Sequence, residues 1–244
     1  MNLVLTGSTS GIGWETLKAL IPLYDRVFLP VRNVKKAEKM FQHLFQKEKI
    51  VLIPMDLSIM AEVKKGAIQI LEQCKEIHLL INNAGILASF LITQVDETNL
   101  HQLYGANVFS AYFCAREAVL RMSTANGGTG GAIVNMSSVA ARLGGLSGGR
   151  AYAGSKGALD SFNLALAKEV GTQGIRVNAI RPGLIETEIH NVHGGVAQMQ
   201  NMAKTAVPMG RSGTAQEVAK VAMWLAGPDA SYVDGSIVDV AGGL

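Results

Sequence analysis

Cysteine, charge and long apolar runs are all scarce in this sequence of 244 residues. Its two cysteines, Cys74 and Cys114, stand far apart and outside any CxxC or CxxH pattern, which argues against a zinc site or a disulfide scaffold. Only 17% of the residues are charged, and no block of like charge suggests an interface with nucleic acid. No apolar stretch is long enough to cross a membrane and no charged leader precedes the first strand-like segment, so we expect a cytoplasmic protein that does not bind membranes.

Core-forming residues, in contrast, are plentiful. Hydrophobic residues make up 48% of the chain, a composition typical of a folded protein rather than a disordered one. A chain of this length can form one large α/β domain or two small ones. No Pro/Ser-rich linker, shift of composition or internal repeat divides the sequence, so we expect residues 1–244 to form a single domain.

Short apolar runs alternate along the chain with longer segments of helical periodicity. This alternation predicts an α/β fold with a seven-stranded parallel sheet and helices on both faces, because strands covered on both sides consist of nearly continuous apolar runs. The densest basic stretch, residues 35–49, has apolar side chains at helical spacing and is interpreted as a solvated helix face. The seven predicted strands are Leu3–Leu5, Val27–Val31, Ile50–Ile53, Leu79–Ile81, Ala132–Met136, Val177–Ile180 and Ile237–Val240.

The first apolar run ends in a glycine-rich segment, residues 6–13, which a helical pattern follows. A strand, a glycine turn and a helix start bring backbone N–H groups and the positive end of a helix dipole to where a pyrophosphate can bind. Glycines can also simply form a tight turn, but their position after the first strand favours a dinucleotide site. The predicted phosphate-binding residues are Gly7, Ser8, Thr9, Ser10, Gly11, Ile12 and Gly13, of which Ser10 could also cap the helix.

The residue after the second strand bears on which dinucleotide binds. Proteins that prefer NAD usually have an acidic residue here for the ribose hydroxyls, whereas this chain has Arg32. Arg32 therefore favours NADP(H), and NAD(H) is the alternative if this arginine is an ordinary surface residue. Open α/β sheets bind ligands at the carboxyl ends of their strands, where this sequence has Asp56, Leu57, Asn83, Ala84 and Gly85.

A tyrosine and a lysine four residues apart are the candidates for the chemistry. Tyr152 and Lys156 lie in a segment that begins a helix, so their side chains should share one face. A nearby ammonium favours the phenolate and makes a tyrosine a usable acid/base, although such a pair on its own is more often structural. The fifth strand runs into Ser137 and Ser138, which brings a hydroxyl to the carboxyl edge of the sheet, where it could bind a substrate oxygen.

Together and in this order, the motifs resemble the short-chain dehydrogenase/reductase family over essentially the whole chain. The resemblance implies a Rossmann-type, doubly wound fold and one domain for both dinucleotide binding and catalysis. It also implies an NAD(P)-dependent hydride transfer between nicotinamide and a carbonyl or secondary alcohol. The residues that match the family pattern are Thr6, Gly7, Gly11 and Gly13, the Asn-Asn-Ala-Gly sequence at 82–85, Asn107, Ser138, Tyr152, Lys156, and the segments 181–187 and 239–243.

The family mechanism implies a role for each matching residue. Tyr152 would give a proton to the carbonyl oxygen in reduction, Ser138 would hold that oxygen, and Lys156 would bind the nicotinamide ribose and lower the pKa of the tyrosine. Asn107 would help to retain a water molecule that links the site to solvent. The residues expected to line the nicotinamide are Pro182, Gly183, Ile185 and Thr187.

Two departures from the family pattern leave choices open. The segment from Ser138 to Tyr152 is one residue longer than the commonest spacing, so Ser137 remains a second candidate for the hydroxyl donor. No basic residue precedes Gly11, so Arg32 is the only sequence signal for NADP(H).

Loops at the carboxyl edge of the sheet are expected to shape the substrate pocket. Residues 144–150 and 190–205 should form its walls, and Arg150 is either a substrate contact or a solvent-facing side chain. A second glycine cluster, residues 127–131, is either a turn or part of a mobile rim. His190 and His193 lack a third ligand, so no metal site is predicted.

Segments 174–178, 182–189 and 210–213 resemble the family branch that contains 3-oxoacyl carrier-protein reductases and bacterial glucose dehydrogenases. Carrier-protein reductases typically have basic residues where this chain has Thr129 and Gln173. This difference favours a free small-molecule substrate, which would be a small ketone, a sugar or a compound of 3-oxoacyl type.

Two other functions and an assembly state remain to be weighed. An epimerase or dehydratase of the extended branch usually needs a longer C-terminal substrate domain. A non-catalytic NADP(H)-binding redox sensor would report to a protein partner, but such proteins tend to lose the tyrosine that this chain has at Tyr152.

The resemblance also implies a homotetramer, assembled through the helices that contain Asn107 and Tyr152 and through the last strand.

Overall fold

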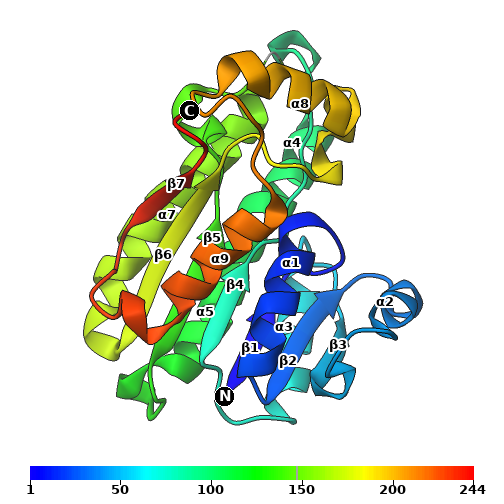
Figure 1. Ribbon diagram of the computed structural model, residues 1–244. Coiled ribbons are helices and arrows are strands. Elements are labelled where there is room, and N and C mark those ends of the chain that lie inside the picture. The colour runs from blue at the N-terminus through cyan, green and yellow to red at the C-terminus, as the bar shows by residue number, and fades with distance from the viewer. Residues whose placement is uncertain (147) are drawn as a thin grey trace.

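The computed structural model, which describes residues 1–146 and 148–244, contains one seven-stranded sheet in which every strand pair is parallel (Figure 1). The strand order is β3-β2-β1-β4-β5-β6-β7, so the winding direction reverses between β1 and β4. All seven predicted strands and the doubly wound fold are confirmed. The strands are β1 (Asn2–Leu5), β2 (Arg26–Val31), β3 (Ile50–Pro54), β4 (Leu79–Asn82), β5 (Gly131–Met136), β6 (Ile175–Pro182) and β7 (Ile237–Val240).

Helices cover both faces of the sheet, and each face has its own apolar core (Figure 1). On one face, Leu17 and Val218 are fully buried against β1 and its neighbours. On the other face, Val170 is fully buried and Cys114 nearly so. The first face carries α1 (Gly11–Leu20), α2 (Val34–Phe41) and α9 (Ala215–Ala226), and the second carries α3 (Met60–Leu71), α5 (Ser110–Met122) and α7 (Arg150–Val170).

The remaining helical segments connect these layers. Near the carboxyl ends of the strands lie α4 (Glu97–Tyr104), the π-helical turn η4 (Gly105–Phe109), α6 (Ala140–Leu143), η7 (Glu188–His193) and α8 (Gly195–Ala206). The other single turns are η1 (Ile21–Leu23), η2 (Lys47–Lys49), η3 (Ile92–Gln94), η5 (Thr124–Asn126), η6 (Gly171–Gln173) and η8 (Pro228–Ala230). No helix in the described ranges is long and apolar enough to cross a membrane.

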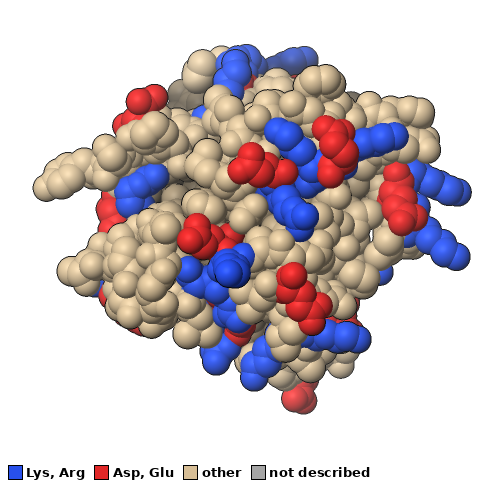
Figure 2. All heavy atoms as spheres, turned by 90° about the horizontal axis from the view of Figure 1, so that it is seen from below, with Lys and Arg blue, Asp and Glu red and all other residues tan. Residues whose placement is uncertain are grey.

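One local prediction is wrong. The basic stretch 35–49 is not one helix, because α2 ends at Phe41, whose ring is buried and stacks on Trp14, while Phe45 is 77% exposed. For the glycine cluster 127–131, the structure decides between the two roles considered: it is the turn that leads into β5, where Gly130 N donates to Met122 O, and it lies at the amino edge of the sheet rather than at the expected rim. At that amino edge, basic and acidic side chains are interspersed (Figure 2).

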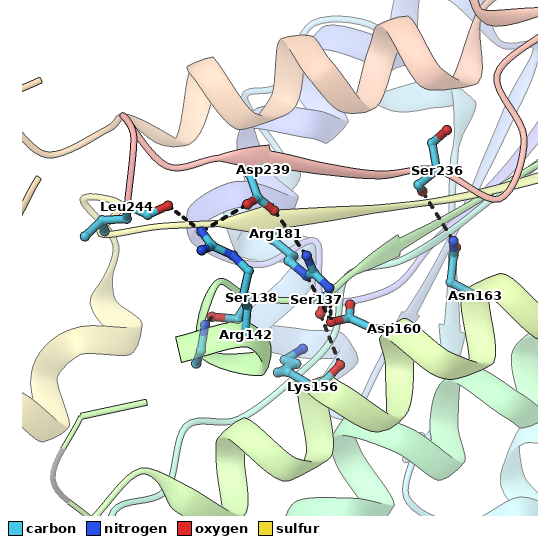
Figure 3. Close-up of polar contacts among 11 residues, drawn as sticks. Ser137, Ser138, Arg142, Lys156, Asp160, Asn163, Arg181, Ser236, Asp239 and Leu244 are labelled. Carbon is cyan, nitrogen blue, oxygen red and sulfur yellow. Dashed lines mark hydrogen bonds and ion pairs between the residues drawn. The ribbon is translucent and has the colours of Figure 1, made fainter. Parts of the chain in front are cut away.

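Buried amides connect the sheet to α7 close to its carboxyl edge. Asn82 Nδ2 donates to Asn135 Oδ1 at 3.0 Å, and Asn135 Nδ2 donates to Asn163 Oδ1 at 3.2 Å. Asn163 Nδ2 in turn donates to Ser236 O at 3.3 Å (Figure 3). Since buried amides are costly when unpaired, this chain of bonds fixes α7 against β4, β5 and the segment before β7.

Candidate active site

A cleft of about 1130 Å³ runs along the carboxyl edge of the sheet. This is the edge where open α/β sheets bind ligands, and the volume exceeds that of most small-molecule pockets. Ser138, Tyr152 and Lys156 line it, together with every residue predicted to bind the cofactor. Those residues are Gly7, Ser8, Thr9, Ser10, Gly11, Ile12, Gly13, Arg32, Asp56, Leu57, Asn83, Ala84, Gly85, Pro182, Gly183, Ile185 and Thr187.

Thr6 and Asn83 hold the glycine-rich loop against the end of β4. Thr6 Oγ1 accepts hydrogen bonds from the N–H groups of Asn83 and Ala84, at 3.0 and 2.9 Å. Asn83 Nδ2 donates back to Thr6 O and to Gly7 O, at 3.2 and 2.9 Å. A Cβ on Gly13 would lie only 2.0 Å from Gly7 O, so the loop can close this tightly only with glycine at that position.

The start of α1 leaves hydrogen-bonding capacity for a ligand. Ser10 occupies the N-cap position, but its side chain makes no capping hydrogen bond, so the alternative role considered for it is not seen. Ser8 Oγ is buried and has no hydrogen-bond partner in the part of the chain that the structure describes. Uncapped N–H groups at the positive end of a ten-residue helix, beside a glycine cradle, fit the pyrophosphate of a dinucleotide.

The end of β2 contributes two cations to the cleft. Arg32 and Lys36 are both exposed and both line it. Asn33, between them, caps α2 by accepting a hydrogen bond from Lys36 N at 3.0 Å. Lys36 was missed by the sequence analysis, although its position in the first turn of a helix that begins after Arg32 is a signal that could have identified it. Asp56 faces this end, and a hydrogen bond from Ser58 lowers the pKa of its carboxyl.

The two neighbouring serines, Ser137 and Ser138, differ in burial and in their hydrogen-bond partners. Ser137 is buried, and its hydroxyl donates to Lys156 O at 3.2 Å (Figure 3). Ser138 is only half-buried, and its hydroxyl is in hydrogen-bond contact with Tyr152. Ser138 Oγ also accepts a bond from Ala140 N at 3.1 Å. The contacts therefore favour Ser138 over Ser137 as the hydroxyl that can reach a substrate.

Tyr152 and Lys156 share one face of α7, as predicted, but the pKa of Tyr152 is not lowered in the way that a nearby ammonium would lower it. Lys156 Nζ lies 5.8 Å from the centroid of the Tyr152 ring and donates to Met136 O at 2.7 Å. Burial lowers the pKa of Lys156 to about 8, while the Asp160 carboxylate raises it. Burial raises the pKa of Tyr152, which the Ser138 hydrogen bond only partly offsets. The phenol is therefore protonated at neutral pH in the protein alone.

Asn107 is not among the residues that line the cleft. It lies behind Gly85, in the π-helical turn η4, and is 1% exposed. Its Oδ1 accepts from Ile86 N at 2.8 Å, and its Nδ2 donates to Ile86 O and to Ser155 Oγ, both at 3.0 Å. The side chain is thus fully engaged in holding η4 and the segment after β4 to α7.

The substrate end of the cleft is mainly apolar. Leu143 and Leu146 from the segment after β5, and Ile189 from η7, line it although they are 51%, 45% and 39% exposed. Large apolar side chains left exposed around a groove mark a binding surface. The other lining residues here, none of them predicted individually, include Leu87, Gln102, Ala106, Glu188, Met202, Ala206 and Leu244.

The predicted pocket walls are therefore found in part. Gly145, Leu146, Gly149 and Met202 line the cleft, whereas Arg150 is exposed and is not a lining residue. Ser147 and the side chains of His190 and His193 lie outside the part of the chain that is described. Among the described residues, no three His, Cys, Asp or Glu side chains are grouped so as to hold a metal ion.

Comparisons with known proteins agree on one family. A family model described as enoyl-(acyl carrier protein) reductase matches residues 7–244. The uncharacterized oxidoreductase YgfF of Escherichia coli is 39% identical over 98% of both chains. The 3-oxoacyl-[acyl-carrier-protein] reductase FabG of Chlamydia muridarum is 32% identical over 99% of this chain and 96% of its own. The structure of ElxO with NADP bound has a TM-score of 0.87 at 27% identity over 99% of this chain and 97% of its own.

We predict that the Tyr152 phenol in the free protein loses its proton only above pH 10, because burial raises its pKa and the hydrogen bond with Ser138 only partly offsets this. The measurement is the ultraviolet absorbance of tyrosinate during a pH titration, taken as the difference between the wild type and Tyr152→Phe. A Tyr152 signal that rises between pH 7 and 9 without cofactor would contradict this.

Proposed function

Because the chain belongs to the short-chain dehydrogenase/reductase family, we propose that it is an NADP(H)-dependent carbonyl reductase that uses Tyr152 as its acid/base. Its structural relative ElxO binds NADP, and a tyrosine-to-phenylalanine variant of ElxO binds NADPH. The observation that carries the proposal is the grouping of Ser138, Tyr152 and Lys156 on one cleft with the glycine-rich loop. All these residues come from one sheet and its helices, which supports a single binding and catalytic domain over residues 1–244.

The contacts of the three side chains suit carbonyl reduction. When bound, the nicotinamide supplies the hydride. Ser138 holds the substrate oxygen with its hydroxyl, and Tyr152 is the proton donor to that oxygen. Because burial keeps the phenol protonated at neutral pH, the side chain is ready to give a proton to the carbonyl oxygen. Lys156 presents a buried ammonium that binds the ribose.

The charge at the end of β2 supports NADP(H) over NAD(H). Arg32 and Lys36 both reach the same end of the cleft, and charge-assisted hydrogen bonds from such groups suit an additional phosphate. Asp56, the acidic residue that lines the cleft here, follows β3 and is engaged with Ser58, so it does not replace the acid expected after β2 of an NAD enzyme.

The substrate that fits best is a free, uncharged carbonyl compound with an aliphatic or aromatic substituent. Leu143, Leu146 and Ile189 offer apolar contacts, which disfavour a sugar. Thr129 and Gln173 are neutral, and Gln173 Oε1 already accepts a hydrogen bond from Ser123 Oγ at 2.6 Å. Neither residue would attract an acidic carrier protein, so a free substrate is favoured over a carrier-bound one.

The non-catalytic sensor remains the alternative, and one substitution separates the two functions. Tyr152→Phe should lose at least about a hundredfold in turnover, because it removes the proton donor, while NADPH affinity stays within about twofold of wild type. The measurement is nicotinamide absorbance with a panel of uncharged ketones, 3-oxoacyl thioesters and sugars. An active Tyr152→Phe variant would refute the acid/base role, and a wild type that binds NADPH tightly but turns over nothing would favour the sensor.

Cofactor preference depends on two side chains that can be tested against a matched control. Arg32→Ala and Lys36→Ala should each weaken NADPH binding about tenfold or more, the loss typical of a charge-assisted hydrogen bond, and leave NADH binding unchanged. Lys39→Ala, on the same helix but outside the cleft lining, should leave both affinities unchanged. Equal losses of NADH and NADPH affinity in the Arg32 and Lys36 variants would show that these residues do not select the phosphate.

Exposed apolar side chains on η4, α5 and α7 support the proposed homotetramer. Phe109, Tyr112 and Leu164 are 41%, 46% and 44% exposed, and Tyr112 stacks on Phe162 of α7. Such a patch on adjacent helices is typical of a subunit interface. Light scattering should give four times the chain mass of 25.9 kDa. Leu164→Glu should reduce that mass. The control Leu23→Glu, at an exposed leucine on the other side of the sheet, should leave it unchanged. A wild type with the mass of a monomer would refute the assembly.

A further inference from the structure

Four charged side chains form a continuous chain from α7 across β6 and β7 to α6 (Figure 3). Arg181 Nη2 and Nε lie 2.8 and 2.9 Å from Asp160 Oδ2. Arg181 Nη1 lies 3.6 Å from Asp239 Oδ1, and Arg142 Nη2 lies 3.2 Å from Asp239 Oδ2. We call Asp160, Arg181, Asp239 and Arg142 the charge ladder. None of the four lines the cleft, so substrate binding does not account for them.

The inner end of the ladder lies one helical turn from Lys156. Asp160 follows Lys156 by four residues on α7, so their side chains share a face. Asp160 is 7% exposed and its Oδ1 has no hydrogen-bond partner among the described residues, which leaves part of its charge uncompensated in a medium of low dielectric constant. Arg181 compensates the other oxygen, as a buried carboxylate requires.

The surroundings of Lys156 offer little else to hold its charge. On the side of β5, Lys156 Nζ donates to the neutral carbonyl of Met136, and the backbone oxygen of Lys156 accepts a hydrogen bond from Ser137. On its own helix, the ammonium lies over the ring of the protonated Tyr152. Asn107 lies across Gly85 from it. Within the described chain, Asp160 is the charged group whose carboxylate raises the pKa of Lys156, which burial alone would lower further.

The outer end of the ladder meets the wall of the substrate pocket. Arg142 belongs to α6, the short helix that follows Ser138, and its neighbour Leu143 lines the cleft. Arg142 Nη2 also donates to the backbone oxygen of Leu244, whose residue lines the cleft from the other side. Arg142 therefore ties α6 and the segment after β7 together at the pocket wall (Figure 3).

We propose that the charge ladder is a positioning device with two functions: Asp160, held by Arg181 one helical turn from Lys156, keeps the Lys156 ammonium charged, and Asp239 and Arg142 hold the pocket wall formed by Leu143 and Leu244. The proposal rests on the proposed function of the cleft. A purely structural brace is the competing explanation, since ion pairs of this kind are common and contribute little stability when they are exposed.

The inner pair is tested by NADPH affinity as a function of pH, measured by nicotinamide fluorescence without substrate. Wild-type affinity should fall as the pH rises through about 8, where Lys156 loses its proton, and Lys156→Met should lack this step. In Asp160→Asn the step should move down by about one pH unit, because the pKa of an ammonium falls when a neighbouring negative charge is removed. A step that stays at the wild-type pH overturns the proposal.

A double variant separates electrostatics from bracing. The double variant Asp160→Asn/Arg181→Gln replaces the ion pair with a neutral hydrogen-bonded pair of similar packing. It also takes the place of Asp160→Asn if that single variant does not fold. A brace would be rescued by this variant, so its pH step would return to the wild-type value, which would overturn the proposal. The ladder predicts that the step stays below its wild-type pH, because the carboxylate beside Lys156 is still missing, but above that of Asp160→Asn alone, because the Arg181 cation is also gone.

The outer pair is tested by KM in the ketone assay. Arg142→Gln should raise KM for the best uncharged ketone about two- to fivefold, the range for a partly exposed ion pair, with the NADPH pH step at its wild-type position. Asp160→Asn should move the pH step without this rise in KM. If both variants change the same parameters, the two-function ladder is overturned. Turnover of the wild type separately decides the proposed function, because the binding series needs no turnover.

Discussion

Lys156 carries its ammonium into a position where only 4% of the residue is exposed, and neighbouring groups have to offset the cost of removing that charge from water. The Met136 carbonyl accepts one hydrogen bond from it, and the Asp160 carboxylate acts on it from the next turn of α7. A buried carboxylate needs a partner of its own, which Arg181 provides from β6. The placement of one buried charge thus constrains side chains on β5, β6 and α7.

The same edge of the sheet shows how separate parts of the chain are brought to one cleft. Thr6 and Asn83 join the glycine-rich loop to the end of β4, at the point where the strand order reverses. Asn135 and Asn163 tie α7 to β5, and so fix the helix that carries Tyr152. The part of the cleft beside the glycine-rich loop and the part beside Tyr152 are therefore tied to the sheet by hydrogen bonds, whereas the part proposed to bind substrate is formed by short helices and loops.

Much of this arrangement could be predicted from the sequence, because strands buried on both faces and glycine turns leave strong local patterns. The seven strands, and the set of residues predicted to bind the cofactor that line one cleft, follow from such patterns. The charge ladder leaves no such local pattern in the sequence. Asp160 and Arg181 meet only because α7 packs beside β6, and no sequence spacing encodes that contact. Helical spacing likewise extended α2 past Phe41, since the burial that ends its apolar stripe is a tertiary property. Asn107 matched a motif, but motif spacing does not indicate whether a side chain faces a cleft or is engaged behind it.

The direct test of this account is the protonation of the Lys156 ammonium, followed by nitrogen-15 NMR during a pH titration of the cofactor-free protein and assigned with Lys156→Met. Burial opposed by Asp160 predicts a titration near pH 8 for this one lysine. A Lys156 that titrates at the ordinary value of 10.5 would contradict the account, because its ammonium would then not be the buried charge around which the site is arranged.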